Sequence, residues 1–310
     1  MEETIYDSAT LLGVFWADDY MTPPENYWLQ FFNSQVNFET EEIDFSKISD
    51  IRKLAPLVVP TAQGVPIYSS AERLVTVAPA YIKAKDTVSA TRMIRRTVGF
   101  GELGRNRTTM TPAQRYNAIV ADIVRQHRYA VERRWEWLAA AAIIDAKVTL
   151  KDDRYPERIV DFQRSANHTI VLTAGNQWGD AGVSILDSLA TMRKLIRDAK
   201  FGGVANRVTV GSDAWEVMRK DVEIREFLNT QYKLGSNINL KLGPREGLEV
   251  EYVGNVETLE IYVYSDYYQD PDGTVRPYMS PKDIVLTAPS VGGVRAFGAI
   301  QDKKANLQPL

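Results

Sequence analysis

One uninterrupted helical stretch constrains this chain more than any other feature. Residues 111–146 contain no glycine and no proline other than Pro112. Thr111 is a favourable N-cap, proline is tolerated at the first helical position, and Gln114 occupies the place of the acid or amide in a capping box. The stretch therefore predicts a single helix from Thr111 to Ala146, which at 1.5 Å per residue would be roughly 50 Å long.

The side chains of this predicted helix divide into an apolar line and a charged remainder. Apolar residues recur with the helical period, interrupted by His127, at Val120, Val124, Val131, Trp135, Leu138 and Ala142. The charged residues expected to cover the remaining surface are Arg115, Arg125, Arg128, Glu132, Arg133, Arg134 and Glu136. A narrow apolar line on so long a helix indicates a strut that lies across a sheet.

Composition and charge exclude several classes of protein. The chain has 310 residues, of which 45% are apolar and 25% charged, as in ordinary globular proteins. It has no cysteine, so disulfides, thiolate nucleophiles and cysteine-ligated zinc are excluded. We expect neither a membrane span nor a signal peptide, because no long apolar run occurs and the amino terminus is acidic. The net charge of −3 argues against a surface that grips nucleic acid.

The segments before the helix contain many aromatic residues and prolines. Residues 1–48 carry Trp16, Trp28, Phe31, Phe32, Phe38 and Phe45, which suggests an arm that buries them on its own chain or on a neighbour, with a folded subdomain as the alternative. Residues 51–105 contain short β-like runs broken by Pro56, Pro60, Pro66 and Pro79. Such runs suit an edge or a projecting two-stranded hairpin, which is not stable alone in water.

The remainder of the chain alternates strands and helices without a regular βαβ repeat. We expect two or three strands within 147–173 and a helix from Ser184 to about Lys200, where Ser184 and Asp187 stand at capping-box spacing. We also expect a buried strand over 204–210 and short helices over 212–218 and 221–228. Four later runs with strand character lie at 248–253, 259–265, 284–289 and 294–300, with a turn-rich excursion in between. This order predicts an α+β fold rather than a doubly wound sheet.

Three glycines form the one nucleotide-like motif. Gly99, Gly101 and Gly104 match G-x-G-x-x-G, but a dinucleotide site needs the third glycine inside the following helix. Here the predicted helix starts only at Pro112. We therefore interpret these glycines as a hinge between the hairpin and the long helix.

No motif in the sequence indicates catalysis or metal binding. His127 and His168 are the only histidines, and neither has a partner at metal-ligand spacing. A G-x-S-x-G elbow is absent. We expect no enzyme, no catalytic residue, no cofactor and no metal.

Five basic residues follow the proline-rich runs. Lys83, Lys85, Arg92, Arg95 and Arg96 form either a solvated face that protects an exposed edge or a set of salt bridges to a neighbouring subunit. Both interpretations remain open on the sequence alone.

A succession of segments resembles one protein family. These segments are WLQFFNSQVNFETEEIDFSKI, LAPLVVPTAQGVPI, APAYIKAKDTVSATRMIRR, RRWEWLAAAAIIDAKVTL with IVDF, VTVGSDAWEVMRKDVEIREFLNTQYKLGSN, RPYMSPKDIVLTAP and GVRAFGAIQD. In this order they resemble the phage lambda-like major capsid proteins, the major capsid protein E group with the Hong Kong 97-type fold. No single motif is diagnostic, but the order covers nearly the whole chain.

The resemblance implies a division of the chain. Residues 1–48 would be an N-terminal arm, 49–105 an extended E-loop, 106–182 a peripheral domain with spine helix 111–146 that residues 291–310 complete, and 183–290 an axial domain. Members usually continue beyond the last strand, so the resemblance implies a shortened chain at Leu310.

The resemblance also implies a function. The chain would form hexamers and pentamers of an icosahedral shell that encloses double-stranded DNA without binding it specifically, in the virion, after assembly in the host cytoplasm. The implied partners are further copies, a separate scaffold protein, a portal protein and, in some systems, a decoration protein. The implied inter-subunit contacts are Trp28, Phe31, Phe32 and the five basic residues. An encapsulin-like bacterial compartment of the same fold is the alternative, and a nucleotide-dependent enzyme built on the three glycines is a more distant one.

Overall fold

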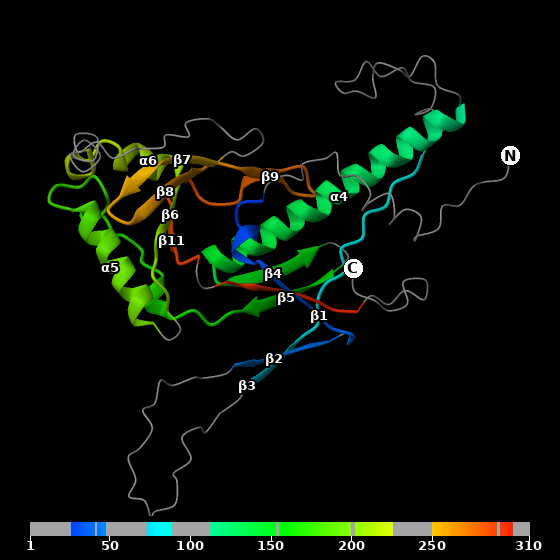
Figure 1. Ribbon diagram of the computed structural model, residues 1–310, viewed down its shortest axis with the longest axis horizontal. Coiled ribbons are helices and arrows are strands. Elements are labelled where there is room, and N and C mark those ends of the chain that lie inside the picture. The colour runs from blue at the N-terminus through cyan, green and yellow to red at the C-terminus, as the bar shows by residue number, and fades with distance from the viewer. Residues whose placement is uncertain are drawn as a thin grey trace, which may run out of the picture.

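The computed structural model describes residues 26–40, 42–47, 73–88, 112–152, 155–199, 202–225, 250–289 and 292–299. Its longest element is the helix α4 (Pro112–Ile144), which runs along one side of a body of short strands and two further helices (Figure 1). Strands and helices are mixed without a βαβ repeat, so the expected α+β class is confirmed. None of the described helices is long and apolar enough to cross a bilayer.

The long helix begins and ends close to the predicted residues. At its C-terminus, the Arg164 guanidinium donates to the carbonyls of Ile143 and Ile144 at 3.0 and 2.8 Å. These carbonyls have no partner within the helix, and a basic group there satisfies them. Ala146 follows with a φ of 55°, which turns the chain out of the helical path and into the next strand.

The central sheet has four strands in a mixed arrangement. Their order is β11 (Ile284–Thr287), β6 (Arg207–Gly211), β8 (Leu259–Tyr264) and β7 (Val250–Val256). Strands β6 and β8 run parallel, and the two outer pairings are antiparallel. All four were predicted as strands, although the sequence indicated neither their order nor their neighbours.

One face of this sheet is covered by two helices. Helix α5 (Ile185–Asp198) begins after Ser184, whose hydroxyl accepts a hydrogen bond from the Asp187 N–H at 3.3 Å, as the capping-box spacing predicted. Helix α6 (Ser212–Met218) follows β6 directly. The apolar core between these helices and the sheet includes Ile185, Leu189, Val208, Val210, Met218, Ile224, Ile261 and Leu286. Burial of these side chains is the main source of stability for this part of the chain.

The opposite face of the sheet is polar and aromatic. Side chains alternate along strands, so Arg207 and Thr209 point away from the helices that Val208 and Val210 face. The register places Glu260 beside Arg207 and Tyr262 beside Thr209. Residues 26–40, called the N-terminal segment below, and the C-terminal half of α4 pack on this face. A second buried cluster forms there from Tyr27, Trp28, Ala139, Ala140, Tyr264, Tyr278 and Met279.

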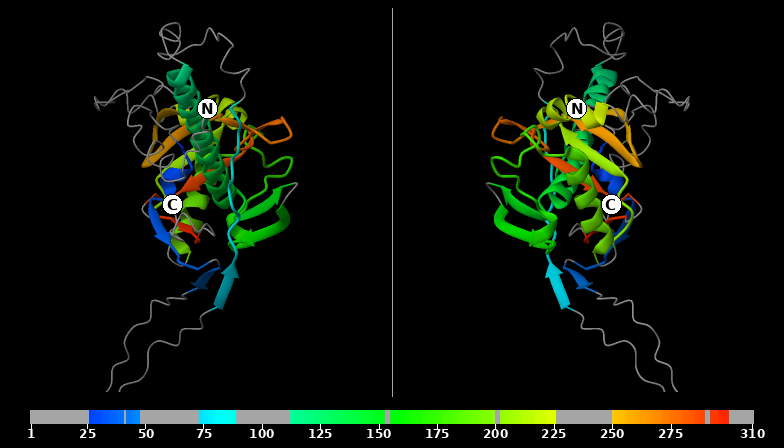
Figure 2. Two further views of the ribbon diagram at one scale, coloured as in Figure 1. Left: turned by 90° about the vertical axis from the view of Figure 1, so that its right-hand side faces the viewer. Right: turned by 90° about the vertical axis from the view of Figure 1, so that its left-hand side faces the viewer.

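Four two-stranded ladders surround the central sheet. The pairs are β4 (Lys147–Asp152) with β5 (Tyr155–Asp161), β9 (Tyr267–Gln269) with β10 (Val275–Pro277), β2 (Ile43–Lys47) with β3 (Arg73–Val77), and β1 (Ser34–Asn37) with β12 (Val294–Phe297). The β2–β3 ladder lies at the edge of the described body, away from the central sheet (Figures 1 and 2). Strand β2 lies within residues 1–48, which were expected to form the N-terminal arm, and it pairs with β3 from the expected E-loop. The ladder therefore begins before the expected start of the E-loop at residue 49.

Backbone hydrogen bonds join residues 31–40 of the N-terminal segment to residues 293–299. Strands β1 and β12 are parallel, with Val36 opposite Ala296. The short 3₁₀ helix η1 (Leu29–Phe31) precedes β1, and the Phe31 carbonyl accepts from the Gly293 N–H at 2.8 Å. Beyond the ladder, the Ala299 N–H donates to the Thr40 carbonyl at 3.1 Å. In the described residues the last strand therefore pairs with the N-terminal segment and not with β4 or β5.

The buried line of α4 differs from the predicted apolar line. The helix residues with the least exposure are Ile119, Ile123, Glu132, Glu136, Ala139 and Ala140, whereas the predicted apolar residues are only half-buried. Glu132 and Glu136 keep 9% and 2% of their exposure, so their assignment to the solvent-covered surface was wrong. Glu136 is buried because this part of the helix packs on backbone N–H groups, which a carboxylate can satisfy and an apolar side chain cannot. Glu132 is instead paired with Arg128 on the same helix.

Candidate functional site

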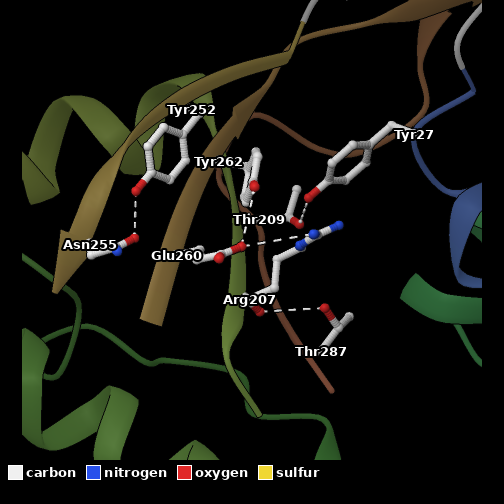
Figure 3. Close-up of polar contacts among 8 residues, drawn as sticks. All are labelled: Tyr27, Arg207, Thr209, Tyr252, Asn255, Glu260, Tyr262 and Thr287. Atoms are coloured by element: carbon white, nitrogen blue, oxygen red, sulfur yellow. Dashed lines mark hydrogen bonds and ion pairs between the residues drawn. The ribbon is translucent and has the colours of Figure 1, made fainter. Parts of the chain in front are cut away.

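The N-terminal segment docks on the open face of the central sheet through Tyr27. Its hydroxyl lies 2.6 Å from the Thr209 hydroxyl, and both side chains are buried (Figure 3). Burial raises the pKa of the Tyr27 phenol to about 12, so the group stays neutral at physiological pH, and one of the two hydroxyls donates a hydrogen bond to the other. Thr209 lies in a strand predicted from its valines, and nothing in the sequence pointed to its polar partner 182 residues earlier.

Trp28 is a core residue of its own chain. Its side chain is 0% exposed, and its ring makes edge contacts with Tyr27 and Tyr264 at centroid distances of 5.2 and 5.4 Å. Such edge-to-face pairs add to the stabilisation from burial. No surface of the ring is exposed in the single chain, so the expected contact of Trp28 with a neighbouring subunit stays a prediction that this burial does not support. The N-terminal aromatic residues were expected to be buried either on their own chain or on a neighbour, and in this structure Trp28 is buried on its own chain.

Arg207 organises the aromatic groups beside this dock. Its guanidinium carbon lies 5.6 Å from the Phe31 ring centroid and 4.8 Å from that of Tyr262. It also forms an ion pair with Glu260 at 3.8 Å, and the Tyr262 hydroxyl donates to the same carboxylate at 3.2 Å (Figure 3). The cation–π contact of Arg207 with Phe31 thus connects the N-terminal segment with β6, and the ion pair of Arg207 with Glu260 connects β6 with β8.

Phe31 and Phe32 are half-buried, unlike Trp28. An added Cβ at Gly293 would overlap the Phe32 ring, so this glycine is needed for the close approach of the last strand. The exposed remainder of both rings is free for a further contact, and their expected role between subunits stays a prediction.

Glu136 holds the backbone of the same segment. Its two carboxylate oxygens accept from the N–H groups of Trp28 and Leu29 at 2.7 and 2.9 Å. These two N–H groups begin the short helix η1, where amides have no partner of their own. Burial nevertheless raises the pKa of Glu136 to about 7, because the loss of hydration outweighs the two hydrogen bonds. No pattern in the sequence marked four residues of this site as functional candidates: Tyr27, Glu136, Arg207 and Thr209.

Lys83 and Lys85 lie on an exposed, extended segment after β3. The Lys83 ammonium is 4.9 Å from the Tyr81 ring centroid, and the Tyr81 hydroxyl donates to the Ala299 carbonyl at 3.3 Å. Tyr81 and its neighbour Ile82 are themselves 41% and 42% exposed. The segment therefore presents apolar and positively charged groups together. Arg92, Arg95, Arg96, Gly99, Gly101 and Gly104 lie outside the described residues.

Further apolar side chains are exposed at other places. Ile159 and Phe162, in and after β5, are 60% and 56% exposed, and Val171 is 81% exposed. His127 is half-buried on α4, and His168 ends the short helix η2 (Ala166–His168). The described ranges contain no group of three or more potential metal-ligating side chains. The arrangement suits packing against other protein surfaces.

Comparison with known proteins identifies the family. A sequence profile of phage major capsid protein E matches residues 10–310. The major capsid protein of Enterobacteria phage P21 is 27% identical over 276 residues, which cover 89% of this chain and 78% of that protein. The major capsid protein of Escherichia phage lambda is 26% identical over 279 residues, or 90% of this chain and 79% of that protein.

A solved structure shows the same fold. The crystal structure of a protein described as a prophage capsid protein of Escherichia coli CFT073 matches 97% of this chain and 86% of its own, with a TM-score of 0.68 and 20% identity. At that identity the likeness concerns the fold alone. The profile match, however, spans nearly the whole sequence, and the chain therefore belongs to the phage major capsid protein E family.

Proposed function

We propose that this chain is the major head protein of a tailed bacteriophage, which assembles into an icosahedral shell around double-stranded DNA. The observation that carries the proposal is the family match over residues 10–310. Copies would form hexamers and pentamers, which bury arm and loop segments against one another so that weak contacts multiply over a closed lattice. The net charge of −3 suits an inner wall that does not retain DNA.

The proposed subunit has the Hong Kong 97-type division of parts. Residues 1–48 act as arm, 49–105 as E-loop, 106–182 with 291–310 as peripheral domain, and 183–290 as axial domain. In support, α4 has the length expected of a spine helix, and the four-stranded sheet with α5 and α6 forms a separate core. Gly99, Gly101 and Gly104 serve as the hinge of the loop during conversion of a procapsid to the mature shell.

The partners follow from the same role. A scaffold protein assists assembly in the host cytoplasm, a portal protein occupies one vertex, and a decoration protein binds the mature shell in those systems that have one. The final location is the virion. The chain itself would act by assembly and would use no cofactor.

The E-loop would hold a neighbouring subunit through its exposed stem. A two-stranded ladder such as β2–β3 is marginal alone, so a second surface must support the loop that it carries. Tyr81, Ile82, Lys83 and Lys85 lie next to this ladder and are exposed in the single chain. We assign them to the contact with the next copy, together with Arg92, Arg95 and Arg96.

A charge reversal tests this contact. The double variant Lys83→Glu and Lys85→Glu should lower the yield of shells in sedimentation and electron microscopy, because like charges replace attractive pairs at each repeated contact. The control variant Lys194→Glu and Lys282→Glu makes the same change in net charge at exposed positions of other segments. Shells from the first variant in the same yield as wild type would remove the two lysines from the interface.

A further inference from the structure

The junction between the N-terminal segment and α4 contains a buried carboxylate. Glu136 is 2% exposed and makes its two hydrogen bonds to main-chain N–H groups of residues 28 and 29. No described basic side chain forms an ion pair with it at this junction. Besides apolar packing, the hydrogen bonds of the segment to the helix therefore end on one carboxyl group, and main-chain N–H dipoles alone compensate its charge.

The groups that surround Glu136 do not favour its ionised form. Asp266, in the loop before β9, raises the pKa of Glu136 electrostatically. Glu136 in turn raises the pKa of three phenols around it, from the N-terminal segment, from β8 and from the loop after β10: Tyr27, Tyr264 and Tyr278. Arg133, on α4 itself, acts on Asp266 and Tyr278. Removal of the N-terminal segment would expose Glu136 to water and relieve this environment.

We propose that docking of the N-terminal segment on α4 is coupled to the protonation of Glu136, so that the segment is held most firmly when this carboxyl is protonated. The proposal concerns the single subunit and goes beyond shell formation. It gives the subunit a device by which a proton controls how firmly the segment from Tyr27 to Phe32 is attached to α4.

The direction of the pH dependence follows from linkage. The docked state has a Glu136 pKa of about 7, against an ordinary value of 4.5 when the side chain is solvated. A raised pKa means that the docked state binds the proton more tightly, so its advantage is complete below 4.5 and is lost as the pH rises through 7. With one proton and these two pKa values, the undocking equilibrium constant rises by roughly tenfold from pH 6 to pH 8. Acid therefore strengthens the attachment, whereas most buried carboxylates that are ion-paired show the reverse.

Hydrogen exchange of the full-length subunit tests the proposal. Exchange of the peptide that contains the Trp28 and Leu29 amides is measured by mass spectrometry at pH 6 and pH 8 and corrected for the intrinsic exchange rate. A peptide from α5 in the same samples reports opening of the whole subunit. We expect the protection of residues 28 and 29 to fall by about tenfold at pH 8, with no matching fall in α5.

Two variants identify the titrating group. Glu136→Gln has no charge at either pH, so its protection should be the same at pH 6 and pH 8. Glu132→Gln changes a buried glutamate one turn earlier that pairs with Arg128 at 2.9 Å, and it should keep the wild-type difference. The proposal is overturned if wild-type protection is equal at the two pH values, or if the difference persists in Glu136→Gln. Either result leaves the shell-forming function untouched, because electron microscopy of assembled particles tests that function separately.

Discussion

The substitution Trp28→Ala distinguishes an internal anchor from a contact between subunits. The Trp28 side chain is fully buried against Tyr27, Tyr264 and α4, so its removal leaves a cavity inside one chain. A buried tryptophan replaced by alanine costs about 3–5 kcal/mol of unfolding free energy. With an unfolding entropy of about 2.1 cal/mol/K per residue over 310 residues, the loss corresponds to a fall in Tm of about 5–8 °C.

The assay is thermal and urea unfolding of the unassembled subunit, at concentrations below those that yield shells. The matched control is Tyr267→Ala, because Tyr267 is an aromatic residue that is 57% exposed and should change stability by at most about 0.5 kcal/mol. If Trp28→Ala unfolds at the same midpoint as this control, and only shell assembly suffers, the ring belongs to a neighbour and the account of the dock is wrong.

Three further substitutions test separate parts of the structure. Tyr27→Phe leaves the buried Thr209 hydroxyl without its partner and should destabilise the subunit by about 1–3 kcal/mol in urea unfolding, whereas a change near zero would show that water replaces the bond. Gly293→Val should push the Phe32 ring away and loosen the last strand, seen as faster hydrogen exchange across residues 293–297, and unchanged exchange would contradict the close approach. Ser184→Ala removes the N-cap of α5 and should lower the free energy of unfolding by about 1 kcal/mol, measured by thermal unfolding. Ser184→Asn keeps a favourable N-cap and should recover most of this stability.

The elements that were predictable carry their signal locally. The helix α4 follows from the proline at its start and from the absence of a later breaker in its thirty-three residues, and α5 follows from the Ser184 cap and its helical period. Strand β6 follows from an apolar stretch rich in valine, and β8 follows from the alternation of its side chains. The turn between β9 and β10 follows from the aspartates and Gly273, which has a φ of 86°. Each of these needed only neighbouring residues.

The dock of the N-terminal segment was not predictable because its partners are distant in sequence. Glu136 meets the backbone of Trp28 and Leu29, a hundred residues away, and any helical glutamate among arginines is ordinarily assigned to solvent. The backbone amides that need it carry no mark in the sequence. For the same reason, the sequence left open whether Trp28 packs on its own chain or on another. The parallel pairing of β1 with β12 is a further case, since nothing local to either strand indicates its partner.

Cryo-electron microscopy of the particles formed by the expressed chain tests shell formation and the position of Trp28 together. We expect closed icosahedral shells in which each Trp28 lies in the aromatic cluster of its own subunit and each Tyr81 to Lys85 segment contacts a neighbouring copy. Small uniform particles without shells would contradict the capsid function. Shells in which Trp28 is inserted into an adjacent subunit would keep that function and contradict the internal dock.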